Sequence, residues 1–115
     1  ISHSSDFLAI AFGKENIGID IEKPNNRIVK LMPKILSEKE FTEFNKDPNI
    51  DLACKFWGAK EAILKYVGDK NLNYREEIKV ITSSLDTAKY LKLNFEVKFE
   101  KIENMILTYV LRSDK

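Results

Sequence analysis

The chain has 115 residues, of which 43% are hydrophobic and 32% charged, and this balance predicts one globular domain over residues 1–115. The formal net charge is only +1 and no apolar run reaches membrane length, so we expect neither nucleic acid nor a membrane as a partner. The single cysteine, Cys54, excludes a disulfide within the chain and indicates core packing in a protein of the reducing cytoplasm. Because the chain begins with Ile1 rather than methionine, we expect it to be part of a longer product.

Turn residues and hydrophobic spacing divide the chain into strands and helices. Ser37 with Glu40 three positions later is the signature of a capping box at the start of a helix. In chain order we expect a strand at 7–12, a strand at 17–22 paired with it as a hairpin, and a helix at 27–36 disturbed by Pro33. We then expect a helix that begins at Ser37, runs through Phe44 and ends at 47–49, and a helix at about 51–67 that ends at Gly68. The remaining residues predict strands at 78–82, 90–99 and 105–111. A hairpin, then helices, then a meander predicts an α+β fold with an antiparallel sheet packed against helices.

The helix expected at 51–67 carries a lysine on its apolar face. A turn of about 100° per residue places Lys60 in the middle of that face. Burying an ammonium without a partner is costly, so Lys60 needs an anion or another role, unless its stem carries the charge to the surface. Glu61 lies at the edge of the same face with Lys65 one turn further on, which suits a phosphate-and-metal site but also a simple surface ion pair.

Two further clusters could carry chemistry. On the strand at 17–22, Asp20 and Glu22 point to the side opposite the isoleucines. This placement suits half of a Mg²⁺ site, but the strand taken alone favours the solvated face of an amphipathic strand. Before the first strand, Ser2 and His3 could bind a phosphate or cap a turn. With one histidine and one cysteine, a zinc site is not expected.

Three segments, in this order and spacing, resemble the 4'-phosphopantetheinyl transferase superfamily. They are residues 1–4 (ISHS), 18–22 (GIDIE) and 56–65 (FWGAKEAILK). The early position of the histidine resembles the larger type that activates peptide and polyketide synthases such as surfactin synthetase. In that type two similar halves are fused into a pseudo-dimer with the coenzyme A site between them. The resemblance therefore implies that residues 1–115 are the second half, plus the last hairpin of a first half.

The resemblance implies an enzyme that transfers the 4'-phosphopantetheine arm of coenzyme A to a serine of an apo acyl or peptidyl carrier protein. The other product would be adenosine 3',5'-bisphosphate, and Mg²⁺ would be the cofactor. The implied metal ligands are Asp20, Glu22 and Glu61, and the implied general base is Glu61 or a metal-bound water. Lys60 and Lys65 would contact phosphates or help to activate the serine. Ser2 and His3 would bind the 3'-phosphate.

Three other hypotheses about the function of the chain stay open. The chain lacks the first half that would supply cationic contacts to coenzyme A, so it could be a half-domain that is inactive alone. It could also be a non-catalytic module that binds carrier proteins, or another Mg²⁺-dependent phosphoryl enzyme. The resemblance also implies that Trp57 packs the motif helix against the sheet.

Overall fold

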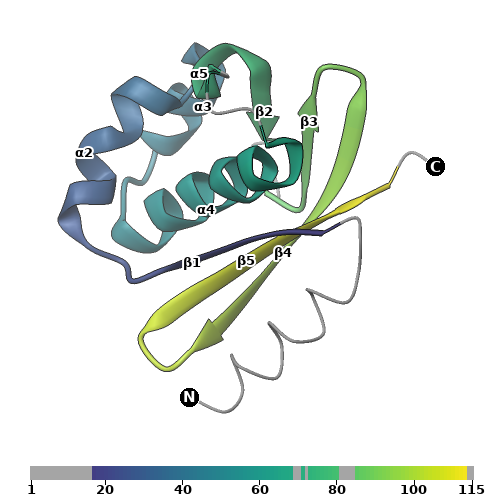
Figure 1. Ribbon diagram of the computed structural model, residues 1–115. Coiled ribbons are helices and arrows are strands. Elements are labelled where there is room, and N and C mark those ends of the chain that lie inside the picture. Colours follow the sequence, from purple (N-terminus) through teal and green to yellow (C-terminus); the bar gives the residue numbers. More distant parts are fainter. Residues whose placement is uncertain (1–16, 69–70, 72, 81–84, 114–115) are drawn as a thin grey trace.

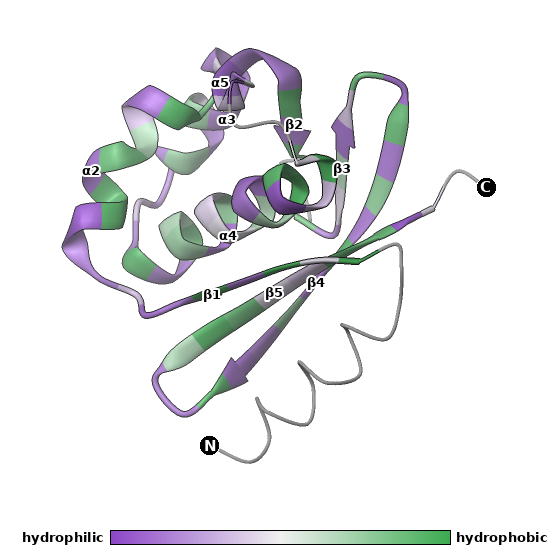
Figure 2. Cartoon of the chain, in the orientation of Figure 1, coloured by the Kyte–Doolittle hydropathy of each residue, from purple (hydrophilic) through white to green (hydrophobic). Residues whose placement is uncertain are grey.

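The computed structural model describes residues 17–68, 71, 73–80 and 85–113. Within them, five strands form one antiparallel sheet in the order β1–β5–β4–β3–β2 (Figure 1). The strands are β1 (Ile17–Glu22), β2 (Ile78–Val80), β3 (Thr87–Tyr90), β4 (Leu93–Ile102) and β5 (Met105–Arg112). Polar and apolar residues alternate along β4, as expected for a strand with one buried face (Figure 2).

Four helices accompany the sheet in the described ranges. They are α2 (Asn26–Ile35), α3 (Glu38–Phe44), α4 (Ile50–Val67) and α5 (Tyr74–Glu77). The longest, α4, contacts β1 and β5 on one side and α2 on another (Figure 1). The predicted α+β architecture is confirmed. No helix in the described ranges is both long and apolar enough to cross a membrane.

The helix boundaries follow from local capping. The side chain of Asn49 accepts a hydrogen bond from the N–H of Leu52 at the start of α4. The predicted stop at Gly68 is confirmed, because this glycine adopts a φ of 78° and its N–H reaches the carbonyl of Leu64 at 2.7 Å. The capping box of Ser37 and Glu40 is also confirmed at the start of α3. Pro33 lies inside α2 without ending it.

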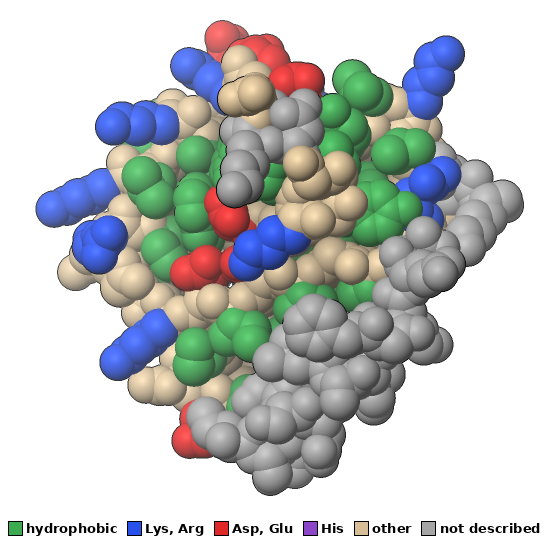
Figure 3. Space-filling view, viewed as in Figure 1, with side chains coloured by type: hydrophobic (Ala, Val, Ile, Leu, Met, Phe, Trp, Pro, Cys, Tyr) green, Lys and Arg blue, Asp and Glu red, His purple; other side chains and the backbone are tan. Residues whose placement is uncertain are grey.

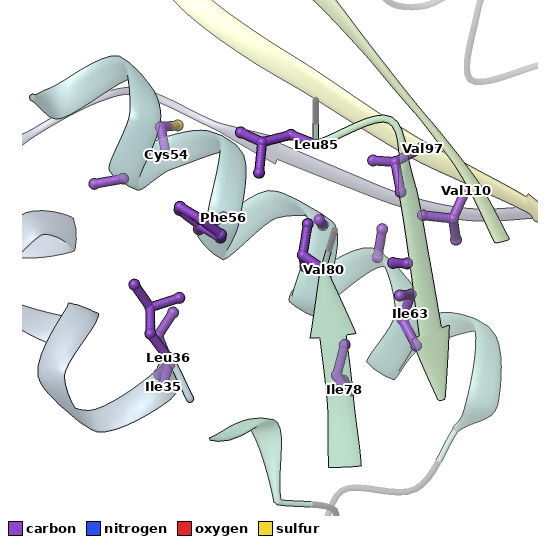
Figure 4. Close-up of a cluster of buried hydrophobic side chains, with 14 of the residues drawn as sticks. Ile35, Leu36, Cys54, Phe56, Ile63, Ile78, Val80, Leu85, Val97 and Val110 are labelled. Atoms are coloured by element: carbon purple, nitrogen blue, oxygen red, sulfur yellow. The ribbon is translucent and has the colours of Figure 1, made fainter. Parts of the chain in front are cut away.

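The core fills the space between α4, the sheet and α2. Buried side chains from all three regions meet there, and Figure 4 shows Leu36, Cys54, Phe56, Ile63, Ile78, Val97 and Val110 among them. Cys54 is buried in this cluster, as predicted. Two glycines permit close packing of α4. A Cβ at Gly18 would overlap the carbonyl oxygen of Ala62, and one at Gly58 would overlap the side chain of Thr108.

Three details differ from the sequence-based expectation. Residues 90–99 are not one strand, because the chain reverses after Tyr90 and separates β3 from β4. Leu91 occupies this turn with a φ of 54° and is 64% exposed, so no glycine or asparagine signals the hairpin. The short helix α5 was not expected. The predicted partner of β1, at 7–12, lies outside the described residues, and on its other edge β1 pairs with β5.

Candidate active site

The candidate site lies where β1 meets α4. Because Gly18 has no side chain, the backbone of α4 approaches the strand closely at Ala62. Alternation along the strand then places Asp20 and Glu22 on the same face as Gly18, directed toward α4. The close approach at Gly18 thus brings the strand carboxylates to the helix that carries Glu61 and Lys65.

Asp20 is the most unusual of these groups. Its side chain is only 2% exposed, and its Oδ1 accepts a hydrogen bond from Lys65 Nζ at 2.9 Å. Its Oδ2 is buried and has no hydrogen-bond partner among the described residues. Burial and the neighbouring Glu22 raise the pKa of Asp20 to about 7, while Lys65 opposes that shift. A buried carboxylate oxygen without a donor is what a bound cation would satisfy.

Lys65 lies among several carboxylates. Burial lowers its pKa, but the hydrogen bond and charge of Asp20, with further contributions from Glu61 and Glu22, raise it above the ordinary value. The Lys65 side chain is 53% exposed, so it keeps access to solvent while its ammonium is bound to Asp20. Acidic and basic side chains adjoin one another near the centre of this face of the molecule (Figure 3). Of the two alternatives for Lys65, the simple surface pair with Glu61 is not formed, and Lys65 pairs with Asp20 instead.

Two aromatic side chains hold the other two carboxylates. The indole Nε1 of Trp57 donates to Glu22 Oε2 at 3.0 Å. The hydroxyl of Tyr74 donates to Glu61 Oε2. The two rings pack against each other with their centroids 5.8 Å apart. Trp57 therefore does more than pack the helix against the sheet, since it also orients a site carboxylate.

Lys60 lies elsewhere, in the interior. Its side chain is 0% exposed, and its ammonium donates to Glu40 Oε1 at 2.7 Å. It also donates to three backbone carbonyls at 2.8, 2.8 and 2.9 Å, those of Ile35, Tyr74 and Ile78. Burial lowers the pKa of Lys60 below its ordinary value, and the charge of Glu40 only partly opposes this shift. The anion that the buried lysine required is thus a glutamate of this chain, and the side chain does not extend to the surface.

Glu40 joins several elements through its two oxygens. Oε1 accepts from Lys60 and from the N–H of Ser37 at 2.8 Å, which completes the capping box. Oε2 accepts from the N–H of Val80 at 2.7 Å. The pair of Lys60 and Glu40 therefore joins α2, α3, α4, α5 and β2. This geometry favours a structural role, and the predicted contact of Lys60 with phosphates has no support in the position of its ammonium.

The structure brings together part of the predicted site. Asp20, Glu22 and Lys65 converge at β1 and α4, and Glu61 lies at the edge bound to Tyr74. Among the described residues, no three Asp, Glu, His or Cys side chains are close enough to share an ion in this conformation. The oxygen donors and the unpaired Oδ2 of Asp20 still fit a hard cation such as Mg²⁺. The predicted phosphate-binding residues Ser2 and His3 lie outside the described residues.

Sequence reasoning missed two residues of this region. Tyr74 carries no motif and follows a turn, so nothing in its local sequence links it to Glu61. Glu40 was assigned only to the capping box, because that pattern explains it locally. Its second role as the partner of Lys60 depends on contacts between residues 20 apart in the chain.

Comparison with known proteins points to one family. The family model described as the 4'-phosphopantetheinyl transferase superfamily matches residues 16–110 of the chain. The curated 4'-phosphopantetheinyl transferase Sfp of Bacillus subtilis (strain 168) is 32% identical over 71 residues, which are 59% of this chain and 32% of that protein. The matched region therefore spans about a third of the length of that curated relative.

Two solved structures share the fold. The holo-[acyl-carrier-protein] synthase from Neisseria meningitidis has a TM-score of 0.65 and 21% identity, covering 87% of this chain and 98% of that one. A holo-(acyl-carrier-protein) synthase from Bacillus anthracis str. Ames, in complex with CoA (3',5'-ADP), has a TM-score of 0.65 and 23% identity. This match covers 86% of this chain and 96% of that one. At these identities the likeness shows a common fold.

Proposed function

The chain belongs to the 4'-phosphopantetheinyl transferase superfamily, and on this premise we propose that it moves the phosphopantetheine arm of coenzyme A onto a serine of an apo acyl or peptidyl carrier protein. The observation that carries the proposal is the carboxylate of Asp20. It is buried, it is bound by Lys65 through one oxygen, and its other oxygen has no partner among the described residues. A buried anion of this kind, next to Glu22 and an accessible lysine, suits a cation bound to a pyrophosphate.

In this proposal Asp20, Glu22 and Glu61 hold Mg²⁺. When bound, the ion would neutralise charge on the pyrophosphate and on the leaving bisphosphate. Lys65 would contact a phosphate oxygen, since its side chain is partly exposed beside Asp20. Trp57 fixes the orientation of Glu22 through its indole N–H.

The proposed reaction is a substitution at phosphorus. The serine oxygen of the carrier protein forms a bond to the phosphorus that bears the pantetheine arm. The bond from that phosphorus to the bridging oxygen breaks, and adenosine 3',5'-bisphosphate leaves with the electron pair. Glu61 would accept the serine proton as the general base, and a water held by the ion, when bound, would be the alternative acceptor. Lys60 stabilises the fold, while Ser2 and His3 are proposed to hold the 3'-phosphate.

We further propose that the chain corresponds to the second half of a two-half enzyme. Because it spans about a third of the curated relative that it matches, a complete coenzyme A site would need residues from elsewhere. This same observation favours the second candidate function, a half-domain or carrier-protein-binding module without activity of its own.

Mass spectrometry of an apo carrier protein tests the proposal. The carrier is incubated with coenzyme A, Mg²⁺ and the intact gene product, and the expected result is a gain of one phosphopantetheine. The Asp20→Asn variant, which keeps the size of the side chain, is expected to give no gain. Absence of labelling by the unmodified protein, with binding of the carrier retained, would refute the transferase and favour the binding module.

A further inference from the structure

The hydrogen bond between Tyr74 and Glu61 has a consequence for metal binding. Asp20 and Glu22 lie two residues apart on β1, so both side chains project from the same face of the strand. Glu61, the third proposed ligand, is instead bound through Oε2 to the hydroxyl of Tyr74. In the part of the chain that the structure describes, these three carboxylates do not form a group that could share one ion. Glu61 must therefore change position to join the other two.

Tyr74 is itself held firmly. Its ring packs against Trp57, with centroids 5.8 Å apart and an interplanar angle of 36°. Its backbone carbonyl accepts a hydrogen bond from the buried ammonium of Lys60 at 2.8 Å. The hydroxyl is thus anchored on two sides, through the ring and through the backbone. The Glu61 side chain has more rotatable bonds than that of Tyr74, so the glutamate is the partner that moves.

We propose that Tyr74 is a positioning residue that holds the Glu61 carboxylate away from Asp20 and Glu22, and that Glu61 leaves the Tyr74 hydroxyl when the metal binds. This inference rests on the proposed function, because it assumes that the three carboxylates hold the ion. The hydrogen bond then competes with metal ligation. It also gives a charged, half-buried glutamate a donor while no ion is present.

The buried lysine has an indirect part in the site. Lys60 binds the carbonyl of Tyr74, and the hydroxyl of Tyr74 binds Glu61, the residue that follows Lys60 in the chain. The interior pair of Lys60 and Glu40 therefore sets the place from which Glu61 is released. Lys60 acts in this way through Tyr74 and not through contact with a phosphate.

The test is a titration of the intact protein with Mn²⁺, followed by electron paramagnetic resonance of the free ion. The variant Tyr74→Phe keeps the ring against Trp57 and removes only the hydroxyl. A hydrogen bond to a charged group corresponds to a change of about tenfold in an equilibrium constant, so Tyr74→Phe is expected to bind Mn²⁺ about tenfold more tightly. Tyr90→Phe makes the same chemical change in the core of β3 and is expected to bind Mn²⁺ as the unmodified protein does.

The direction of the effect separates this role from a structural one, since damage to the fold weakens metal binding and does not tighten it. Equal or weaker binding of Mn²⁺ by Tyr74→Phe, with normal binding by the unmodified protein, overturns the inference and leaves the proposed metal site standing. Absence of Mn²⁺ binding by both proteins refutes the metal site itself, and the inference falls with it. Circular dichroism of each variant verifies that it is folded.

Discussion

Replacement of Lys60 by methionine separates a structural lysine from a catalytic one. The substitution removes the ammonium but keeps an unbranched apolar chain of similar length. It leaves Glu40 as a buried carboxylate without its counter-charge, and three backbone carbonyls lose a donor. Breaking a buried ion pair costs about 3–5 kcal/mol, against a total stability of about 5–15 kcal/mol for a typical domain.

For a domain of this size, that loss corresponds to a decrease of about 10–20 °C in melting temperature. The assay is thermal unfolding of the intact protein by circular dichroism, with Lys39→Met as the matched control. Lys39 is an exposed lysine on α3 next to Glu40, so its replacement is expected to change the free energy of unfolding by less than about 0.5 kcal/mol. If Lys60→Met has the melting temperature of the unmodified protein but loses transferase activity, then Lys60 acts on the substrate and its structural role is refuted.

Three further substitutions test the candidate site and the packing of α4 against β1 that positions it. Because burial and Glu22 raise the pKa of Asp20 from 3.8 to about 7, the folded state binds this proton more tightly than the unfolded state, and stability falls as pH rises from about 4 to 7. In the metal-free protein, Asp20→Asn is therefore expected to raise the free energy of unfolding by up to about 4 kcal/mol at pH 8 and to leave it unchanged below pH 4. Urea unfolding measures both values, and an equal increase at the two pH values would contradict the raised pKa of Asp20. Trp57→Phe removes the hydrogen-bond donor to Glu22 Oε2, so the affinity for Mn²⁺ is expected to fall about tenfold. Calorimetry measures this affinity, and unchanged binding would show that the indole does not orient the Glu22 carboxylate. Gly18→Ala forces a Cβ onto the carbonyl oxygen of Ala62, so the free energy of unfolding is expected to fall by more than about 2 kcal/mol. Urea unfolding measures this change, and normal stability would show that α4 can move away from β1.

Much of the local structure could be predicted because its causes lie close together in the chain. The capping box at Ser37 and the stop at Gly68 each depend on residues within one turn of a helix. The alternation in β1 correctly placed Asp20 and Glu22 on one face. The hairpin after Tyr90 was missed because Leu91 adopts a left-handed conformation that leucine rarely favours.

The sequence by itself determined that the motif helix would carry a lysine in an apolar environment, and that three motifs in order resemble one transferase superfamily. Only the tertiary structure decided which partner each charged group has. Lys60 pairs with Glu40, Asp20 with Lys65, and Glu61 with Tyr74. Burial of an ion requires a partner, and this requirement can be read from hydrophobic spacing. The identity of the partner depends on which distant segments the sheet and helices bring within hydrogen-bonding distance, and local spacing carries no information about that.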